Sequence, residues 1–63
     1  MNCLRVDTGF TDEHSESLFT GDKVANESWR IGTIVFRHGR YQVRYDNYYT
    51  DLADEHDVLI LLD

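Results

Sequence analysis

The sequence is poor in the residues that would add covalent or metal-based stability to a short chain. It has 63 residues, a single cysteine and no proline. Because Cys3 has no second cysteine to pair with, an intramolecular disulfide is excluded, and an unpaired cysteine is typical of a reducing cytoplasm. Cys3, His14, His38 and His56 show none of the spacings of a zinc site, so we expect no metal and no other cofactor. One small hydrophobic core must therefore hold the fold together.

Long hydrophobic runs are also missing. The longest apolar run, residues 58–62, has the length of a strand and falls far short of the roughly 20 residues that a transmembrane helix needs. The N-terminus lacks the apolar region of a signal peptide. No repeat or linker divides the chain. We therefore expect one domain in a cytoplasmic protein that has no membrane partner.

Signatures of catalysis are absent as well. The four glycines are isolated from one another, so the chain has no glycine-rich phosphate-binding loop. Ser15, Ser17 and Ser28 lie in polar segments without the glycines of a nucleophile elbow. In so acidic a chain, a pair such as Asp54 and Asp57 is more typical of a solvated surface than of an acid–base couple. We expect no enzymatic activity and no catalytic residue.

Basic residues are scarce. Twelve acidic residues face six basic ones, which gives a net charge of −6. Residues 1–22 carry one basic and five acidic residues, and residues 46–63 carry six acidic residues and no basic one. Residues 23–45, in contrast, carry five basic residues and one acidic residue. Long-range repulsion opposes binding of DNA or RNA to such a chain, so we expect a protein partner. The basic centre leaves two alternatives open: local contact with phosphate, or pairing of the arginines with the acidic flanks.

The basic centre has the pattern of one β-hairpin. A two-residue turn at His38 and Gly39 would pair Arg37 with Arg40 and Ile34 with Val43, since the alternation of side chains along a strand fixes the register. One face, which we predict to be the core, then carries Ile34, Phe36, Tyr41, Val43 and Tyr45. The other, a cationic surface, carries Thr33, Val35, Arg37, Arg40, Gln42 and Arg44.

Shorter elements flank this hairpin. Residues 18–25 indicate a strand bent at Gly21 and Asp22, followed by a loop at residues 26–28. After a turn at Asp46 and Asn47, we expect a short strand at residues 48–52, a helical or 3₁₀ turn at residues 53–57 capped by Asp51 or Asp54, and a last strand at residues 58–61. Residues 1–17 form an acidic N-terminal arm or edge strand: residues 3–6 have the composition of a short edge strand, and residues 7–17 that of a mobile arm or long loop. We predict that residues 1–16 are dispensable for folding.

Four segments carry a resemblance to a known group of folds: residues 21–24, residues 29–34, residues 41–46, and residues 50–52 leading to residues 57–59. The order of a strand, a loop, a long hairpin, a short strand, a 3₁₀ turn and a last strand resembles the SH3-like small barrels of the Tudor, Agenet and KOW-like group. The resemblance implies an all-β fold, a small five-stranded barrel over residues 18–63. Short barrels similar to this one occur among uncharacterised phage-type proteins, which implies an accessory protein of a phage or bacterium.

The resemblance also implies a binding region. Tudor-like domains bind through aromatic side chains of the loop after the first strand and of the turn after the third, often helped by a carboxylate. The matching neighbourhood here contains Trp29, Tyr45, Asp46, Asn47, Tyr48 and Tyr49. A methyl-lysine cage is one alternative, although Arg30 and Asn47 depart from the pattern of such cages. Packing of Trp29 and Tyr45 in the core or at its rim is the other.

Two classes of function follow. The first is a non-enzymatic protein-interaction module that uses Trp29, Tyr48 and Tyr49 together with the basic face Arg37, Arg40 and Arg44. The second is an acidic nucleic-acid mimic that inhibits a DNA- or RNA-binding enzyme with the carboxylates of residues 7–16 and 46–57. Weak RNA or DNA binding, as the resemblance to KOW domains implies, is a further alternative. Both a monomer and a homodimer fit the sequence, because the apolar last strand has two faces to cover.

Overall fold

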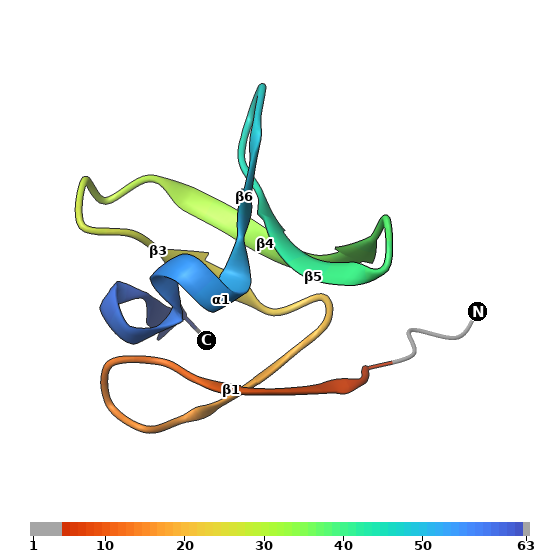
Figure 1. Cartoon of the computed structure of the whole chain (residues 1–63). Helices are drawn as coiled ribbons and strands as arrows, with labels where there is room; N and C mark the ends of the chain where they lie inside the picture. Colours follow the sequence, from red (N-terminus) through yellow and green to blue (C-terminus); the bar gives the residue numbers. More distant parts are fainter. Residues whose placement is uncertain (1–4, 63) are drawn as a thin grey trace.

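The chain folds as an all-β domain, and the computed structural model describes its residues 5–62 (Figure 1). Within them, five strands form one antiparallel sheet and two form a small ribbon. The ribbon consists of β1 (Asp7–Thr11) and β2 (Ser17–Phe19). The sheet has the order β6-β5-β4-β3-β7, with strands β3 (Lys23–Ala25), β4 (Ile31–Arg37), β5 (Arg40–Arg44), β6 (Tyr49–Asp51) and β7 (Ile60–Leu62). Between β6 and β7 lie helix α1 (Leu52–Glu55) and the 3₁₀ turn η1 (His56–Val58).

The predicted hairpin register is confirmed. Strands β4 and β5 pair Arg37 with Arg40 and Ile34 with Val43. The turn residues His38 and Gly39 both have positive φ, 55° and 78°, as a two-residue turn that matches the strand twist requires. The predicted core face is right at one end only. Ile34 and Val43 are fully buried, whereas Phe36, near the turn, is 58% exposed.

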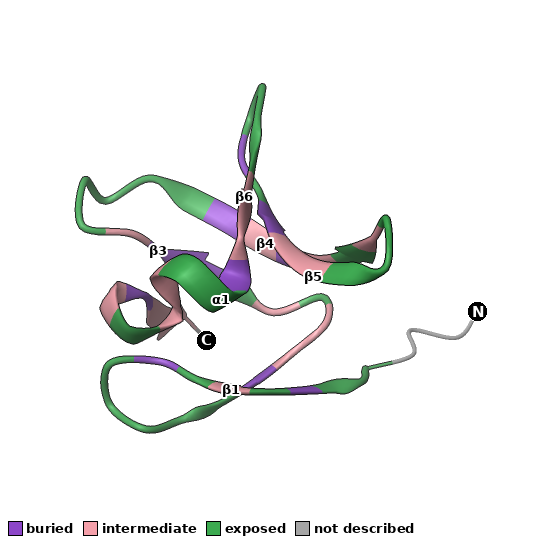
Figure 2. Cartoon of the chain, in the orientation of Figure 1, coloured by how far each residue is buried: buried purple, intermediate pink, exposed green. Residues whose placement is uncertain are grey.

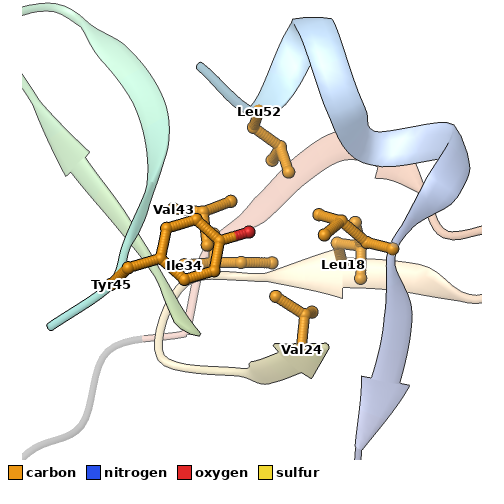
Figure 3. Close-up of a cluster of buried hydrophobic side chains, with 7 residues drawn as sticks. Leu18, Val24, Ile34, Val43, Tyr45 and Leu52 are labelled. Atoms are coloured by element: carbon orange, nitrogen blue, oxygen red, sulfur yellow. The ribbon is translucent and has the colours of Figure 1, made fainter. Parts of the chain in front are cut away.

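The core lies between the sheet, the ribbon and α1. Its buried members come from strands β2 to β5, from α1 and from the residues that follow β5 and η1 (Figure 3), and are Leu18, Val24, Ile34, Val43, Tyr45, Leu52 and Leu59. Each large aliphatic side chain contributes about 1.5–3 kcal/mol by leaving water. Because Leu18 lies on β2 and Leu52 begins α1, the ribbon and the helix cover the inner face of the sheet.

The expected closed barrel is not formed. Strands β6 and β7 are the two ends of the sheet order, and no pairing joins them within residues 5–62. Figure 1 shows the ribbon and α1 on the inner side of the curved sheet. An open sheet covered by these two elements therefore replaces the closed five-stranded barrel.

The N-terminal segment differs from the expected mobile arm. Residues 7–11 form strand β1, which pairs with β2 in an irregular register. The Thr8 hydroxyl donates to the Leu18 carbonyl at 2.9 Å, and the Val6 N–H donates to the Thr20 hydroxyl at 3.0 Å. These contacts are polar, and residues 7–11 lack the alternation of apolar and polar side chains by which a strand is recognised in a sequence. Of the short strand predicted at residues 3–6, the first two residues lie outside the described part, and the other two belong to no strand.

Smaller differences concern the boundaries of elements. The strand predicted at residues 18–25 is divided into β2 and β3 by a turn at Thr20 and Gly21, where Gly21 has a φ of 90°. The last strand begins at Ile60 because η1 continues to Val58. Asp51 is the N-cap residue of α1, yet its side chain makes no cap hydrogen bond. Among the described residues, no helix is long and apolar enough to cross a membrane.

Candidate interaction surface

Trp29 is the most exposed large hydrophobic side chain in the described part of the chain. Its exposed fraction is 71%, and it lies in the loop between β3 and β4. Figure 2 colours most of this loop as exposed. Its φ of 61° is in the left-handed region, which costs a residue other than glycine about 1–2 kcal/mol. Packing of Trp29 in the core, one of the two alternatives for this residue, is therefore wrong. The loop holds a large apolar side chain in water on a strained backbone.

Asn26 holds this loop in its conformation. Its side-chain oxygen accepts hydrogen bonds from the N–H groups of Ser28, at 2.9 Å, and Arg30, at 3.0 Å. Its backbone accepts from the Trp29 N–H at 2.9 Å and donates to the Arg30 carbonyl at 3.0 Å. Four hydrogen bonds thus fix five residues, and they offset the strain at Trp29. Trp29 is therefore exposed in a loop whose conformation these hydrogen bonds fix.

Tyr45 connects this loop to the turn before β6 and to α1. It is buried, which confirms rim or core packing for this residue, and its hydroxyl donates to Glu55 Oε1 at 3.0 Å. Burial raises the pKa of Tyr45 to about 12, with further contributions from the Glu55 charge and the hydrogen bond to it, while hydrogen bonds with Asn26 and Thr50 act in the opposite direction. Thr50 also donates to Glu55.

The turn between β5 and β6 places a second aromatic group beside Tyr45. The Tyr45 N–H donates to the Tyr48 carbonyl at 2.8 Å, which closes the turn over Asp46 and Asn47. The Tyr48 ring stacks on that of Tyr45 with centroids 4.9 Å apart. Tyr48 remains partly exposed, as does Ile31 at the start of β4. We call the exposed apolar side chains of this end of the sheet the aromatic rim: Trp29, Ile31 and Tyr48.

A shallow hollow of about 450 Å³ lies beside the aromatic rim. It is lined by residues of β3, β4, β5 and the following turn: Lys23, Ile31, Thr33, Arg44, Tyr45 and Asp46. Asn47 is exposed and does not line it. Two cations at this hollow would repel a cationic guest, so the geometry gives the methyl-lysine alternative no support.

The three arginines of the predicted basic face have different surroundings. Arg40 forms an ion pair with Asp51 at 3.1 Å, so pairing with the acidic flanks applies to this residue. The Arg37 guanidinium lies 3.8 Å from the centroid of the Tyr49 ring, a cation–π contact on the outer face of the sheet. Arg44 has no carboxylate within 4 Å among the described residues.

One further residue of this face, Lys23, was not predicted from the sequence. Strand β3 pairs Lys23 with Thr33, and β5 pairs Thr33 with Arg44. Directly paired side chains lie on the same face of a sheet, so Lys23 extends the basic face to a third strand. The pairing of β3 with β4 crosses an irregular loop, and no short-range pattern reveals its register. The basic face therefore comprises Lys23, Arg37, Arg40 and Arg44.

No protein-family model, curated protein or solved structure matches this chain. Any functional inference therefore depends on its own residues. Within the described range, no group of three or more metal-binding side chains is assembled.

A second, more apolar groove lies nearer the β4–β5 turn and shares Thr33 with the first hollow. Its volume is about 790 Å³, and its walls include Val6, Ile34, Phe36 and Tyr41. The Phe36 and Tyr41 rings meet edge to face with centroids 4.9 Å apart. Arg5, at its edge, forms an ion pair with Asp22 at 2.7 Å. The exposed Phe36 provides a comparison for Trp29, since both are large aromatic groups in water at different ends of one sheet.

Proposed function

We propose that this chain is a small non-enzymatic interaction module that binds another protein through the aromatic rim and the adjoining basic face. The observation that carries the proposal is the 71% exposure of Trp29 on a strained loop held by Asn26. Tryptophan is enriched among the residues that dominate binding energies at interfaces. Covering a side chain of this size with a partner contributes about 1.5–3 kcal/mol.

The basic face gives the interface an electrostatic component. Lys23, Arg37 and Arg44 lie on one face of a chain whose net charge is −6. Such a face favours a partner segment that carries negative charge, and Tyr49 adds apolar area beside Arg37. We expect rim contacts to set the dissociation rate, and the cations to set the association rate and its dependence on salt.

We further infer that the five-stranded sheet is an open relative of the SH3-like, Tudor-like barrels. The strand order β6-β5-β4-β3-β7 and the 3₁₀ turn directly before the last strand support this inference. Phage or bacterial origin and cytoplasmic location stay predictions.

An acidic nucleic-acid mimic is the second candidate. The observation in its favour is that two acidic segments distant in sequence lie together. The Glu13 N–H donates to the Leu59 carbonyl at 3.0 Å, and the Phe10 and His56 rings are 4.9 Å apart. The β1–β2 loop thus lies against the segment that contains η1, so two acidic stretches of the chain, residues 12–16 and 54–57, belong to neighbouring segments.

Capture of partners from nuclease-treated lysate of the source cell tests the first proposal. The matched variants are Trp29→Ala and Phe36→Ala, which each remove one exposed aromatic group from opposite ends of the sheet. We expect a protein partner that Phe36→Ala retains and Trp29→Ala loses, with both variants equally folded by circular dichroism. Equal retention by both variants would contradict the proposal. A captured nucleic-acid enzyme that DNA displaces would favour the mimic.

A further inference from the structure

Three hydrogen-bond donors lie side by side on the outer face of the sheet. Lys23, Thr33 and Arg44 occupy directly paired positions on β3, β4 and β5. Neighbouring strands are about 4.8 Å apart, so the backbones of the two cationic residues are separated by only about 10 Å, with the threonine between them. The ammonium, hydroxyl and guanidinium groups can therefore reach a single small anion.

Within residues 5–62, the two cations form no ion pair. Neither Lys23 nor Arg44 has a carboxylate within 4 Å in residues 5–62, whereas Arg5 and Arg40 each form an ion pair. The chain carries twelve acidic residues, so the missing partners do not reflect a shortage of carboxylates. Like charges close together on one face of a sheet repel each other. A bound anion would remove this repulsion.

The surrounding surface is hollowed around these donors. The hollow of about 450 Å³ is lined by all three, with Ile31 and Tyr45 as its apolar walls. Its one acidic lining residue, Asp46, does not reach either cation within 4 Å, so the lining keeps an excess of positive charge. Asp46 disfavours an anion in the hollow, and its removal should strengthen binding.

We propose that Lys23, Thr33 and Arg44 bind a phosphate monoester group carried by the protein partner, an inference that rests on the proposed function. A phosphate monoester presents three terminal oxygens and nearly two negative charges at neutral pH. Three donors that line one hollow match these oxygens in number, whereas a carboxylate offers two oxygens and one charge. Charge-assisted hydrogen bonds to the two cations supply most of the attraction.

A short phosphoserine peptide with neutral flanking residues is the probe. It is titrated into the ¹⁵N-labelled full chain at low salt, and its unphosphorylated form serves as the comparison. We expect saturable shifts of the amide signals of residues 23, 33 and 44 with the phosphopeptide alone. Shifts of equal size with the unphosphorylated peptide would overturn the proposal, as would tighter binding of a single-stranded oligonucleotide, which would assign the site to nucleic acid.

Three variants that each alter one charge sharpen this test. Arg44→Gln should weaken phosphopeptide binding about tenfold, because it removes one charge-assisted contact. Arg30→Gln removes the same charge from an exposed loop position outside the hollow and should leave affinity within about twofold, since salt screens distant surface charges. Asp46→Asn should strengthen binding. Equal weakening by Arg44→Gln and Arg30→Gln would reduce the site to a nonspecific charge effect and overturn the proposal.

Failure of this proposal and failure of the proposed function give different results. Phosphatase treatment of the lysate should abolish partner capture by the wild type. Capture that depends on Trp29 but survives both phosphatase and Arg44→Gln would overturn the phosphate site and leave the interaction module intact. Capture that Trp29→Ala retains and Arg44→Gln loses would support the phosphate site and contradict the role of the aromatic rim.

Discussion

The β4–β5 hairpin and the β1–β2 ribbon are held together by different kinds of interaction. The first has a regular register, a two-residue turn and the buried pair Ile34 and Val43. The second has an irregular register, and a five-residue loop joins its strands. In that loop, Asp12 is only 4% exposed and accepts three backbone hydrogen bonds.

The comparison shows two ways in which a small chain orders a pair of strands. In β4–β5, apolar burial and turn chemistry act between residues that are close in sequence. In β1–β2, a carboxylate satisfies backbone donors from its own loop and from a distant strand. The Asp12 Oδ1 atom accepts from His14 and Glu16 at 2.8 and 2.9 Å, and Oδ2 accepts from the Leu61 N–H at 2.9 Å. The ribbon is thereby joined to the free edge of β7.

The largest effect is expected from a charge in the core of the β4–β5 hairpin. Ile34→Asp places a carboxylate at a fully buried position without a partner, so we expect loss of cooperative thermal unfolding by circular dichroism. Phe36→Asp is the control, since Phe36 lies two residues later on the same face and is 58% exposed. A cooperative transition in Ile34→Asp would contradict the assigned core.

The next largest effect is expected at Asp12. Asp12→Ala removes the acceptor of three backbone N–H groups, and we expect a loss of about 2–4 kcal/mol in the free energy of unfolding, measured by urea titration. Asp7→Ala is the control, because Asp7 is exposed and its side chain accepts from one N–H, that of Gly9. In Asp12→Asn, the side-chain oxygen can still accept the two hydrogen bonds within the loop, whereas the NH₂ group would face the Leu61 N–H and cannot accept from it. This variant should therefore lose less free energy of unfolding than Asp12→Ala. Equal stability of the two alanine variants would show that the carboxylate does not hold the ribbon.

Acid should weaken the ribbon before the β4–β5 hairpin. Burial alone would raise the pKa of Asp12, but hydrogen bonds from the Leu61, Glu16 and His14 N–H groups, with the nearby His14 charge, hold it below the ordinary value of 3.8. A pKa that is lower in the folded state stabilises the fold fully above the unfolded-state value, and this contribution is lost as the pH falls through the folded-state value. The stability of the wild type should therefore fall below about pH 4. In the Asp12→Asn variant, the free energy of unfolding should decrease less as the pH is lowered. An unchanged decrease in that variant would assign the acid sensitivity to other carboxylates.

The smallest loss of stability is expected when one glycine of each strand pair is replaced by alanine. Gly9 in β1 and Gly39 in the β4–β5 turn have φ values of 82° and 78°, and an added Cβ atom would meet nothing within 4 Å at either position. Since only backbone strain changes, alanine at either site should cost about 1 kcal/mol, a difference that thermal melts resolve. A much larger cost at Gly39 would indicate that the turn contributes more to folding than the ribbon does.

The binding surface was predictable only in part. The sequence assigned Trp29, Tyr48 and Tyr49 to the predicted binding region but left core packing of Trp29 open, and all three are exposed. Lys23 was missed because its neighbour Thr33 lies across a loop, and the Asn26 hydrogen bonds that hold Trp29 outward involve loop geometry without periodicity. The link from Asp12 to Leu61 joins positions 49 residues apart. It argues against the prediction that residues 1–16 are dispensable.

The sequence by itself determined the β4–β5 hairpin, its register and which of its residues share a face, because alternation and turn chemistry act between near neighbours in the chain. That Phe36 of the predicted core face is exposed was decided by the tertiary structure. The tertiary structure alone decided that residues 7–11 are a strand, that the sheet stays open between β6 and β7, and that Lys23 lies in line with Thr33 and Arg44. These features depend on hydrogen bonds and packing between distant segments. Their partners become neighbours only after the chain has folded.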